Sequence, residues 1–99
     1  MQTFTLKSGT NKGNRRIWIE GDRLARAGFV KGDRLTRTIE GDTITLAPAT
    51  DGGKISIAGT PARPIIDQCG KWVTAFMGDA ERFRVTITNK TITITPEKG

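Results

Sequence analysis

The densest run of basic residues, KSGTNKGNRR, spans residues 7–16. It contains no acidic residue and four cations, Lys7, Lys12, Arg15 and Arg16. Its glycines, asparagines and threonine offer amides and short side chains that can lie along a phosphate backbone. We therefore predict a flexible, phosphate-clamping loop in which Asn11 or Asn14 reads base edges. The alternative is a solvated connection whose charge serves solubility.

Three further arginines are candidates to extend this basic patch. Arg23 and Arg26 fall on an expected short helix, and Arg37 falls on an expected hairpin. The alternative is that they cover a wet helix face and an exposed strand face. Trp18 alternates with Ile17 and Ile19, so it either stacks on a base or packs against a neighbouring structural unit.

The charge of the whole chain favours a polyanionic partner. Sixteen Lys and Arg against ten Asp and Glu give 99 residues a net charge of +6 and a pI near 10.1. Residues 1–50 hold nine basic and five acidic residues, and residues 51–99 hold seven and five. We therefore expect DNA binding, mainly by the first half. RNA stays open, because charge does not distinguish the two nucleic acids and no aromatic stacking motif of RNA-binding domains is present.

The residue types argue against catalysis. The chain has no histidine and one cysteine, Cys69, which excludes Ser-His-Asp and Cys-His systems and does not suit a zinc site. No Gly-rich phosphate loop of the P-loop type occurs. Four of the five acids of the first half sit at expected caps and turns: Asp22, Asp33, Glu40 and Asp42. We predict no enzymatic activity, no metal and no cofactor.

The location of the protein follows from two missing signals. No run approaches the ~20 apolar residues of a membrane span. The beginning of the chain, MQTFTLKSGT, lacks the charged-then-apolar pattern of a signal peptide. We expect a cytoplasmic protein without a membrane partner.

Two stretches 48 residues apart resemble each other. Residues 15–48 and 63–96 align without gaps and agree at ten of 34 positions. The agreement includes the tripeptide TIT, which is followed by Leu in the first stretch and by Ile in the second. We predict one domain, 1–99, built of two repeats at approximately 1–50 and 51–99. Half of the chain is too short to bury a comfortable core alone, so the repeats should interlock. The alternative is a coincidence between two threonine-rich hairpins.

The repeats read as mainly β with one or two short helices. Period-two patterns predict strands at 16–20, 35–39 and 43–46, the last two joined by a hairpin loop at 40–42. Asn89 takes the loop position in the second repeat. A helix should follow Gly21, with Asp22 as N-cap and Gly28 as the stop. Its counterpart in GKWVTAFMG (70–78) should be irregular or shorter. The remaining large aromatics, Trp72, Phe76 and Phe83, are assigned to the core.

Residues 16–46, RIWIEGDRLARAGFVKGDRLTRTIEGDTITL, resemble the SymE-like branch of the AbrB/SpoVT superfamily. The resemblance covers about a third of the chain and rests on Gly21, Leu24, Ala27, Gly28, Phe29, Gly32 and the hairpin that follows. The second repeat keeps a GKWV start but has TAFM in place of Ala-Gly-Phe. We therefore expect it to keep the scaffold and to have lost part of the function.

The resemblance implies a swapped-hairpin barrel, which two short chains of the family form by exchanging hairpins. It also implies DNA binding, with roles in type I toxin–antitoxin systems, nucleoid compaction or transcription regulation. We hypothesise that this chain folds on itself as a monomeric pseudo-dimer, the alternative being a homodimer. A second functional hypothesis is that the chain is a small phage or mobile-element protein that binds and inhibits a bacterial defence complex or another protein complex. An open β edge would suit such a protein-binding role.

Overall fold

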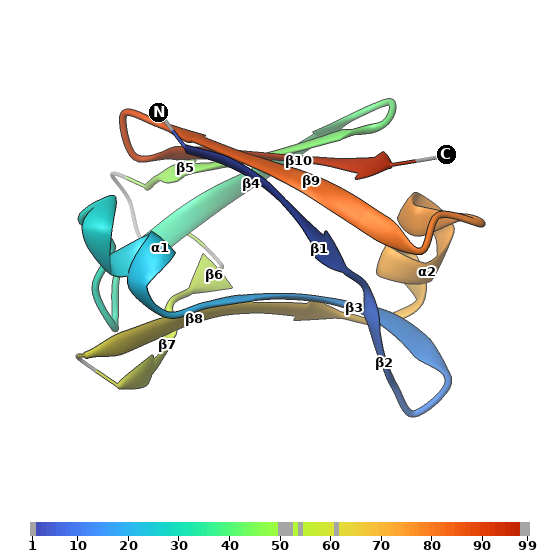
Figure 1. Ribbon diagram of the computed structural model, residues 1–99, viewed down its shortest axis with the longest axis horizontal. Coiled ribbons are helices and arrows are strands. Elements are labelled where there is room, and N and C mark those ends of the chain that lie inside the picture. The colour runs from blue at the N-terminus through green and yellow to red at the C-terminus, as the bar shows by residue number, and fades with distance from the viewer. Residues whose placement is uncertain (1, 50–52, 54, 61, 98–99) are drawn as a thin grey trace.

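The computed structural model describes residues 2–49, 53, 55–60 and 62–97. About 60% of the structure is strand, arranged in two antiparallel sheets with two short helices (Figure 1). The prediction of a mainly β fold with one or two short helices is confirmed. The sheets lie one above the other in Figure 1, and the helices lie at opposite sides of the molecule between them.

The same order of elements occurs twice along the chain. The first series is β1 (Gln2–Lys7), β2 (Gly9–Asn11), β3 (Asn14–Glu20), α1 (Asp22–Arg26), β4 (Arg34–Glu40) and β5 (Thr43–Pro48). The second series is β6 (Ile55–Ser56), β7 (Ala58–Thr60), β8 (Arg63–Cys69), α2 (Lys71–Met77), β9 (Arg82–Thr88) and β10 (Thr91–Glu97). The predicted repeat boundary at 50/51 lies outside the described residues.

The helices differ from expectation in two respects. The N-cap of α1 is Gly21 and makes no side-chain cap bond, so the prediction of Asp22 as N-cap is wrong: Asp22 is the first helical residue. Helix α2 is longer than α1, seven residues against five, so the expected irregular second helix is also wrong. Val73 and Met77 are four positions apart and both fully buried, so packing overrides the weak helix propensity of this segment. Neither helix in the described ranges is long and apolar enough to cross a membrane.

The two sheets are open. The six-stranded sheet has the order β1-β9-β10-β5-β4-β6, and the four-stranded sheet has the order β2-β3-β8-β7. The expected closed barrel is therefore wrong, because closure would require every strand to pair on both sides. Here β1 leaves the larger sheet and continues into β2 of the smaller one after a single residue, Ser8. The sheets are joined by covalent continuation at this corner.

The centre of each sheet pairs one strand from each series. In the smaller sheet β3 pairs with β8, and Trp18 lies opposite Asp67. In the larger sheet β5 pairs with β10, and Thr45 lies opposite Thr93. The outer strands are exchanged as well, since β1 pairs with β9 and β6 pairs with β4. Each series therefore depends on the other for its strand neighbours.

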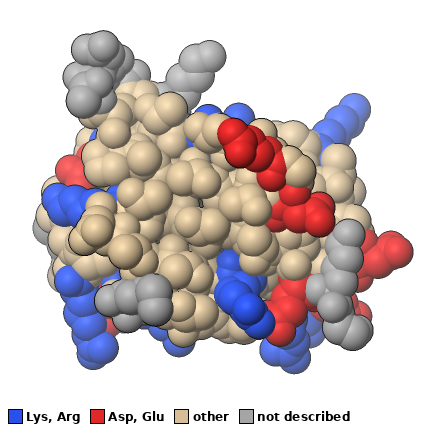
Figure 2. Space-filling model, turned by 90° about the horizontal axis from the view of Figure 1, so that it is seen from above, with Lys and Arg blue, Asp and Glu red and all other residues tan. Residues whose placement is uncertain are grey.

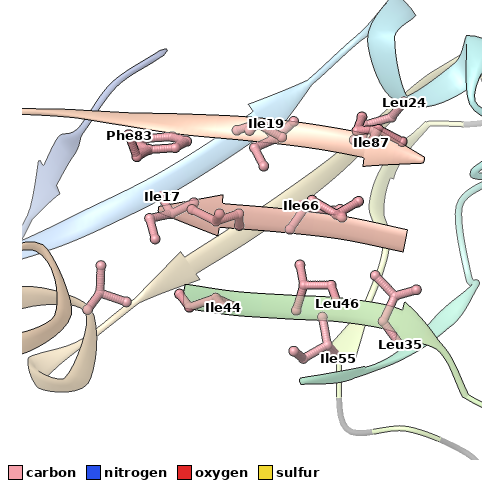
Figure 3. Close-up of a cluster of buried hydrophobic side chains, with 14 of the residues drawn as sticks. Ile17, Ile19, Leu24, Leu35, Ile44, Leu46, Ile55, Ile66, Phe83 and Ile87 are labelled. Carbon is pink, nitrogen blue, oxygen red and sulfur yellow. The ribbon is translucent and has the colours of Figure 1, made fainter. Parts of the chain in front are cut away.

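One hydrophobic core fills the space between the sheets (Figure 3). Both series contribute fully buried side chains, among them Ile17, Leu46, Ile66 and Phe83. Of the three aromatic residues assigned to the core, Phe83 is buried in it. Trp72 and Phe76 are half-buried and pack against the outside of the core.

The outer face of the larger sheet is rich in threonine. Along β9, β10 and β5, buried aliphatic residues alternate with residues such as Thr86, Thr93 and Thr45 that point outward. Figure 2 shows this face largely without charge, with basic and acidic side chains mainly around its periphery. A surface for a polyanion has to be sought elsewhere on the molecule.

The two series differ most in their first strands. Strand β1 pairs with β9 over six residues, from Arg82 to Ile87, whereas β6 pairs with β4 at Arg34 and Leu35 alone. Ile87 is consequently 3% exposed, while Ile39, which precedes it by 48 positions on β4, is 46% exposed.

These two isoleucines form a matched pair for a stability test. We expect Ile87→Ala to lower the free energy of unfolding by about 2–5 kcal/mol, because it leaves a cavity in the core. Ile39→Ala should change it by less than about 0.5 kcal/mol, as exposed positions usually do. Urea denaturation of both variants measures the difference. An equal loss in the free energy of unfolding for both variants would contradict the conclusion that β1 covers Ile87 and that no strand covers Ile39 in the same way.

Candidate nucleic-acid interface

The basic segment at residues 7–16 folds into a β-hairpin. Strands β2 and β3 pair down to Asn11 and Asn14, which leaves a turn of two residues, Lys12 and Gly13. Both have positive φ, 52° and 84°, as a type I′ hairpin turn requires, and glycine takes that conformation without steric cost. The expectation of a flexible loop is therefore wrong: the backbone groups of this segment are used in a sheet.

Arg15 is tied to the rest of the protein. Its side-chain Nε donates to Ser8 Oγ at 3.2 Å, and a terminal guanidinium nitrogen donates to the carbonyl oxygen of Ala80. Its backbone N–H donates to Thr74 Oγ1 at 2.8 Å, and the same hydroxyl lies 3.3 Å from Asn14 Oδ1. Arg15 and Asn14 thus fasten the hairpin to α2 and to the loop that follows it. Arg15 has fewer free donors for a phosphate than its charge suggests.

Arg16 is paired with an acid on the neighbouring strand. Its Nε and one terminal nitrogen donate to the two carboxylate oxygens of Asp67 at 2.9 and 2.8 Å. The guanidinium also lies over the ring of Trp18, 4.2 Å from its centroid. The hydrogen bond to Asp67 raises the pKa of Arg16, so its guanidinium stays protonated. Asp67 cancels its net charge but fixes its orientation, and the other guanidinium donors keep their bonding capacity.

A groove of about 450 Å³ collects three of the predicted cations. Lys7 from the end of β1, Arg16 from β3 and Arg23 from α1 line it, together with the ring of Trp18. The remaining lining residues are Leu6, Gly9, Thr10 and Glu20. Of these lining residues only Glu20 is acidic, so basic groups predominate.

Local packing sets the position of Arg23 in this groove. Its guanidinium lies 4.2 Å from the centroid of the Phe4 ring on β1. Its backbone carbonyl accepts a hydrogen bond from the side chain of Gln2 at 3.0 Å. The first strand therefore holds the start of α1, and an aromatic face supports the cation without neutralising it.

The other predicted cations lie elsewhere. Lys12 is exposed at the tip of the hairpin, and Arg26 is exposed at the end of α1. Arg37 belongs to a separate groove of about 790 Å³, where it donates to Gln68 Oε1 at 2.9 Å and lies 4.1 Å from the Trp72 ring centroid. The structure thus brings together Lys7, Arg16 and Arg23, and it places Arg37 apart from them.

Sequence reasoning missed the partners that shape these cations. Phe4 contacts Arg23 within the first series, and Asp67 contacts Arg16 through pairing between the two series. No local pattern reveals either contact. The alternation of Trp18 with Ile17 and Ile19 was a sequence signal that Trp18 faces away from these isoleucines. No sequence signal indicated that Asp67 would lie opposite Trp18. In the described part of the chain, no group of three or more His, Cys, Asp or Glu side chains is arranged to hold a metal ion.

A matched pair of variants separates the tethered cation from the exposed one. Arg15→Gln should lower the free energy of unfolding by about 1–3 kcal/mol, because the Ala80 carbonyl loses its charged donor. Lys12→Gln removes the same charge at the exposed turn and should change stability by less than about 0.5 kcal/mol. Urea denaturation at neutral pH gives both values. If Arg15→Gln proved as mild as Lys12→Gln, the tethering role would be wrong.

Comparison with known proteins adds no relative. No protein-family model matches the chain, no curated protein matches it, and no solved structure matches it. The groove therefore rests on its own geometry: three basic side chains and an indole ring, positioned by strands from both halves of the chain.

Proposed function

We propose that the protein binds DNA through the groove of Lys7, Arg16, Trp18 and Arg23. The observation that carries the proposal is the convergence of three basic side chains from three different elements on one groove, whose lining has a single acid, Glu20. Asp67 neutralises Arg16 from outside the lining, so Lys7 and Arg23 provide the net positive charge. Phosphate contacts of this kind provide most of the affinity for nucleic acid and are independent of sequence. The chain's net charge of +6 supports the same partner.

The side chains have distinct tasks in this proposal. Lys7 and Arg23 contact successive phosphates through their positive charges, because neither forms an ion pair with another described residue. Arg16 is held by Asp67 and presents its remaining N–H groups to a phosphate or a base edge. The Trp18 ring supports the guanidinium of Arg16, which lies over it, and the plane of that guanidinium is the surface against which an unstacked base can pack.

The hairpin of β2 and β3 extends this surface to Lys12. A two-residue turn that is already closed loses less conformational entropy on binding than a flexible loop. The proposed role of Lys12 is a further phosphate contact at the tip. Arg26, exposed at the end of α1, is a secondary candidate.

We also propose that the chain is a single-chain pseudo-dimer of two SymE-like units. The support is the exchange of strands between the two series: β3 with β8, β5 with β10, β1 with β9 and β4 with β6. Such exchange parallels the hairpin swapping of the AbrB/SpoVT superfamily, here in two open sheets. On this proposal the protein acts by binding, without catalysis, as a cytoplasmic, nucleoid-associated toxin or transcription regulator.

Separate expression of the halves tests the pseudo-dimer. Each half alone would lack the partner of its central strands, so fragments 1–50 and 51–99 should show no cooperative thermal unfolding by circular dichroism while they sediment as monomers. The whole chain should unfold in one transition and sediment as a monomer. A half that unfolds cooperatively as a monomer would refute the interlocked arrangement, whereas a half that folds only as a homodimer would agree with it.

A triple variant tests the DNA-binding groove. Lys7→Gln, Lys12→Gln and Arg23→Gln together remove three proposed phosphate contacts. We expect weaker binding to duplex DNA, and the slope of log affinity against log salt should become shallower by about 2 to 3, since each phosphate contact contributes about 0.9. Fluorescence anisotropy across a salt series measures both quantities.

The matched control removes the same charge elsewhere. Lys31, Lys71 and Lys90 are exposed and do not line the groove, so changing all three to Gln lowers the net charge equally. If both triple variants lose the same affinity, binding follows overall charge and the groove has no special role. Single-stranded DNA and RNA probes of equal length complete the series, and a preference for RNA would overturn the choice of DNA.

A further inference from the structure

The outer edge of β4 is paired over only part of its length. At its beginning, Ile57 N–H donates to the Asp33 carbonyl and Gly32 N–H donates to the Ile57 carbonyl, both at 2.9 Å. Strand β6 then pairs with Arg34 and Leu35. Within the described ranges, no strand pairs with this edge from residue 36 to residue 40.

The backbone groups that face this open side can be assigned. The Arg34 carbonyl accepts from Ala49 N–H, on the β5 side of the strand, whereas the Asp33 carbonyl faces β6. Backbone groups of successive residues in a strand point to opposite sides. Arg37 and Ile39 therefore direct their N–H and C=O groups away from β5, toward the open edge.

The side chains at this edge are also uncovered. All five residues from Thr36 to Glu40 are exposed, and Ile39 is one of two large hydrophobic residues that the described chain leaves exposed. An exposed strand edge that carries a β-branched aliphatic residue is a template for pairing with another chain.

The other half of the molecule contains the occupant that this edge lacks. Strand β1 pairs with β9, with Phe4 opposite Val85 and Gln2 opposite Ile87. Val85 and Ile87 lie 48 positions after Arg37 and Ile39, on the equivalent strand, and they are buried. An extended segment with alternating apolar residues thus covers the counterpart of the open edge.

A groove beside the open edge would take the side chain of an incoming strand. It measures about 790 Å³ and is lined by Arg37, Ile55, Gln68, Trp72 and other residues. In the other half, Phe4 lies opposite Val85 and contacts Arg23 of α1. Trp72 lies 49 positions after Arg23, on α2, and the Arg37 guanidinium lies 4.1 Å from the centroid of its ring. A residue opposite Arg37 would therefore lie beside this stacked pair of Arg37 and Trp72.

We propose that the edge from Thr36 to Glu40 binds an extended segment of a partner protein, which adds an antiparallel strand to the larger sheet. The segment carries an aromatic or long aliphatic side chain opposite Arg37, directed into the groove of Trp72. A second copy of this chain fits less well. Antiparallel pairing of β4 with β4 about Thr38 would bring Gly41 and Asp42 of the copy alongside Leu35 and Arg34, where β6 already pairs.

This surface is distinct from the proposed DNA groove. It lies on β4 and α2 and shares no lining residue with the groove of Lys7, Arg16 and Arg23. Binding of a protein segment there does not depend on DNA binding, and failure of one proposal leaves the other standing.

Amide hydrogen exchange by NMR tests the edge in the whole protein. In the free monomer, the amides of Arg37 and Ile39 should exchange much faster than those of Val85 and Ile87, which β1 covers. The probe is the capped peptide QTFTLK, the sequence of β1. At 1 mM, a dissociation constant of about 100 μM would slow exchange at Arg37 and Ile39 by about tenfold. The control is the same peptide with N-methyl groups on the amides of its Gln and Phe, the residues that would lie opposite Ile39 and Arg37 and direct their N–H groups toward β4.

Two variants locate the contact. Ile39→Pro removes an edge N–H that β5 does not use, so it should abolish peptide binding. Ile39→Ala keeps that N–H and should weaken binding less. Circular dichroism verifies that both remain folded.

Three results would overturn the proposal. The first is slow exchange at Arg37 and Ile39 in the free monomer, because the chain itself would then fill the edge. The second is protection that rises with protein concentration together with dimerisation in sedimentation, which would assign the edge to a second copy. The third is a peptide that produces no protection at Arg37 and Ile39 at 1 mM, or equal protection by the N-methylated control.

Discussion

The structure depends on hydrogen bonding between strands from opposite halves of the chain. At the centre of each sheet a strand of the first series lies against its counterpart, β3 against β8 and β5 against β10. Neither half could enclose an interior of its own, because about 50 residues bury too small a fraction of their surface. Pairing across the halves brings the aliphatic faces of both into one core. The grooves at the surface inherit this constraint, since each is bordered by strands that the pairing holds in place.

The sequence predicted the strands better than their partners. Period-two alternation located β3, β4 and β5, and in β3 and β5 buried residues alternate with more exposed ones. The length of α2 was not predictable from propensity, since burial of Val73 and Met77 decides it. The open sheets were also missed. Whether a sheet closes depends on the lengths of its edge strands, and the two-residue β6 leaves no local sequence signal.

The basic residues show why a charge count is a poor guide to a binding site. Arg15 and Arg16 are adjacent in sequence, yet one is bonded to Ser8 and Ala80 and the other to Asp67. A contiguous run of positive charge thus divides into side chains that hold the fold and side chains that remain available to a ligand. Lys7 and Arg23, 16 positions apart, meet at one groove because β1 crosses toward α1. The tertiary fold, and not proximity in the chain, decides which cations act together.

The two halves carry different surfaces on the same order of elements. Strand β8 and helix α2 begin 49 residues after β3 and α1. At this offset, the residues that correspond to Lys7, Trp18 and Arg23 are Ser56, Asp67 and Trp72. The first groove is consequently cationic, and the second combines an indole with polar groups beside an open strand edge. Shortening the first strand of the second series is what leaves β4 uncovered, while the full-length β1 seals β9. One half can have a short edge strand while the core stays intact, because the central pairs that hold the core involve other strands.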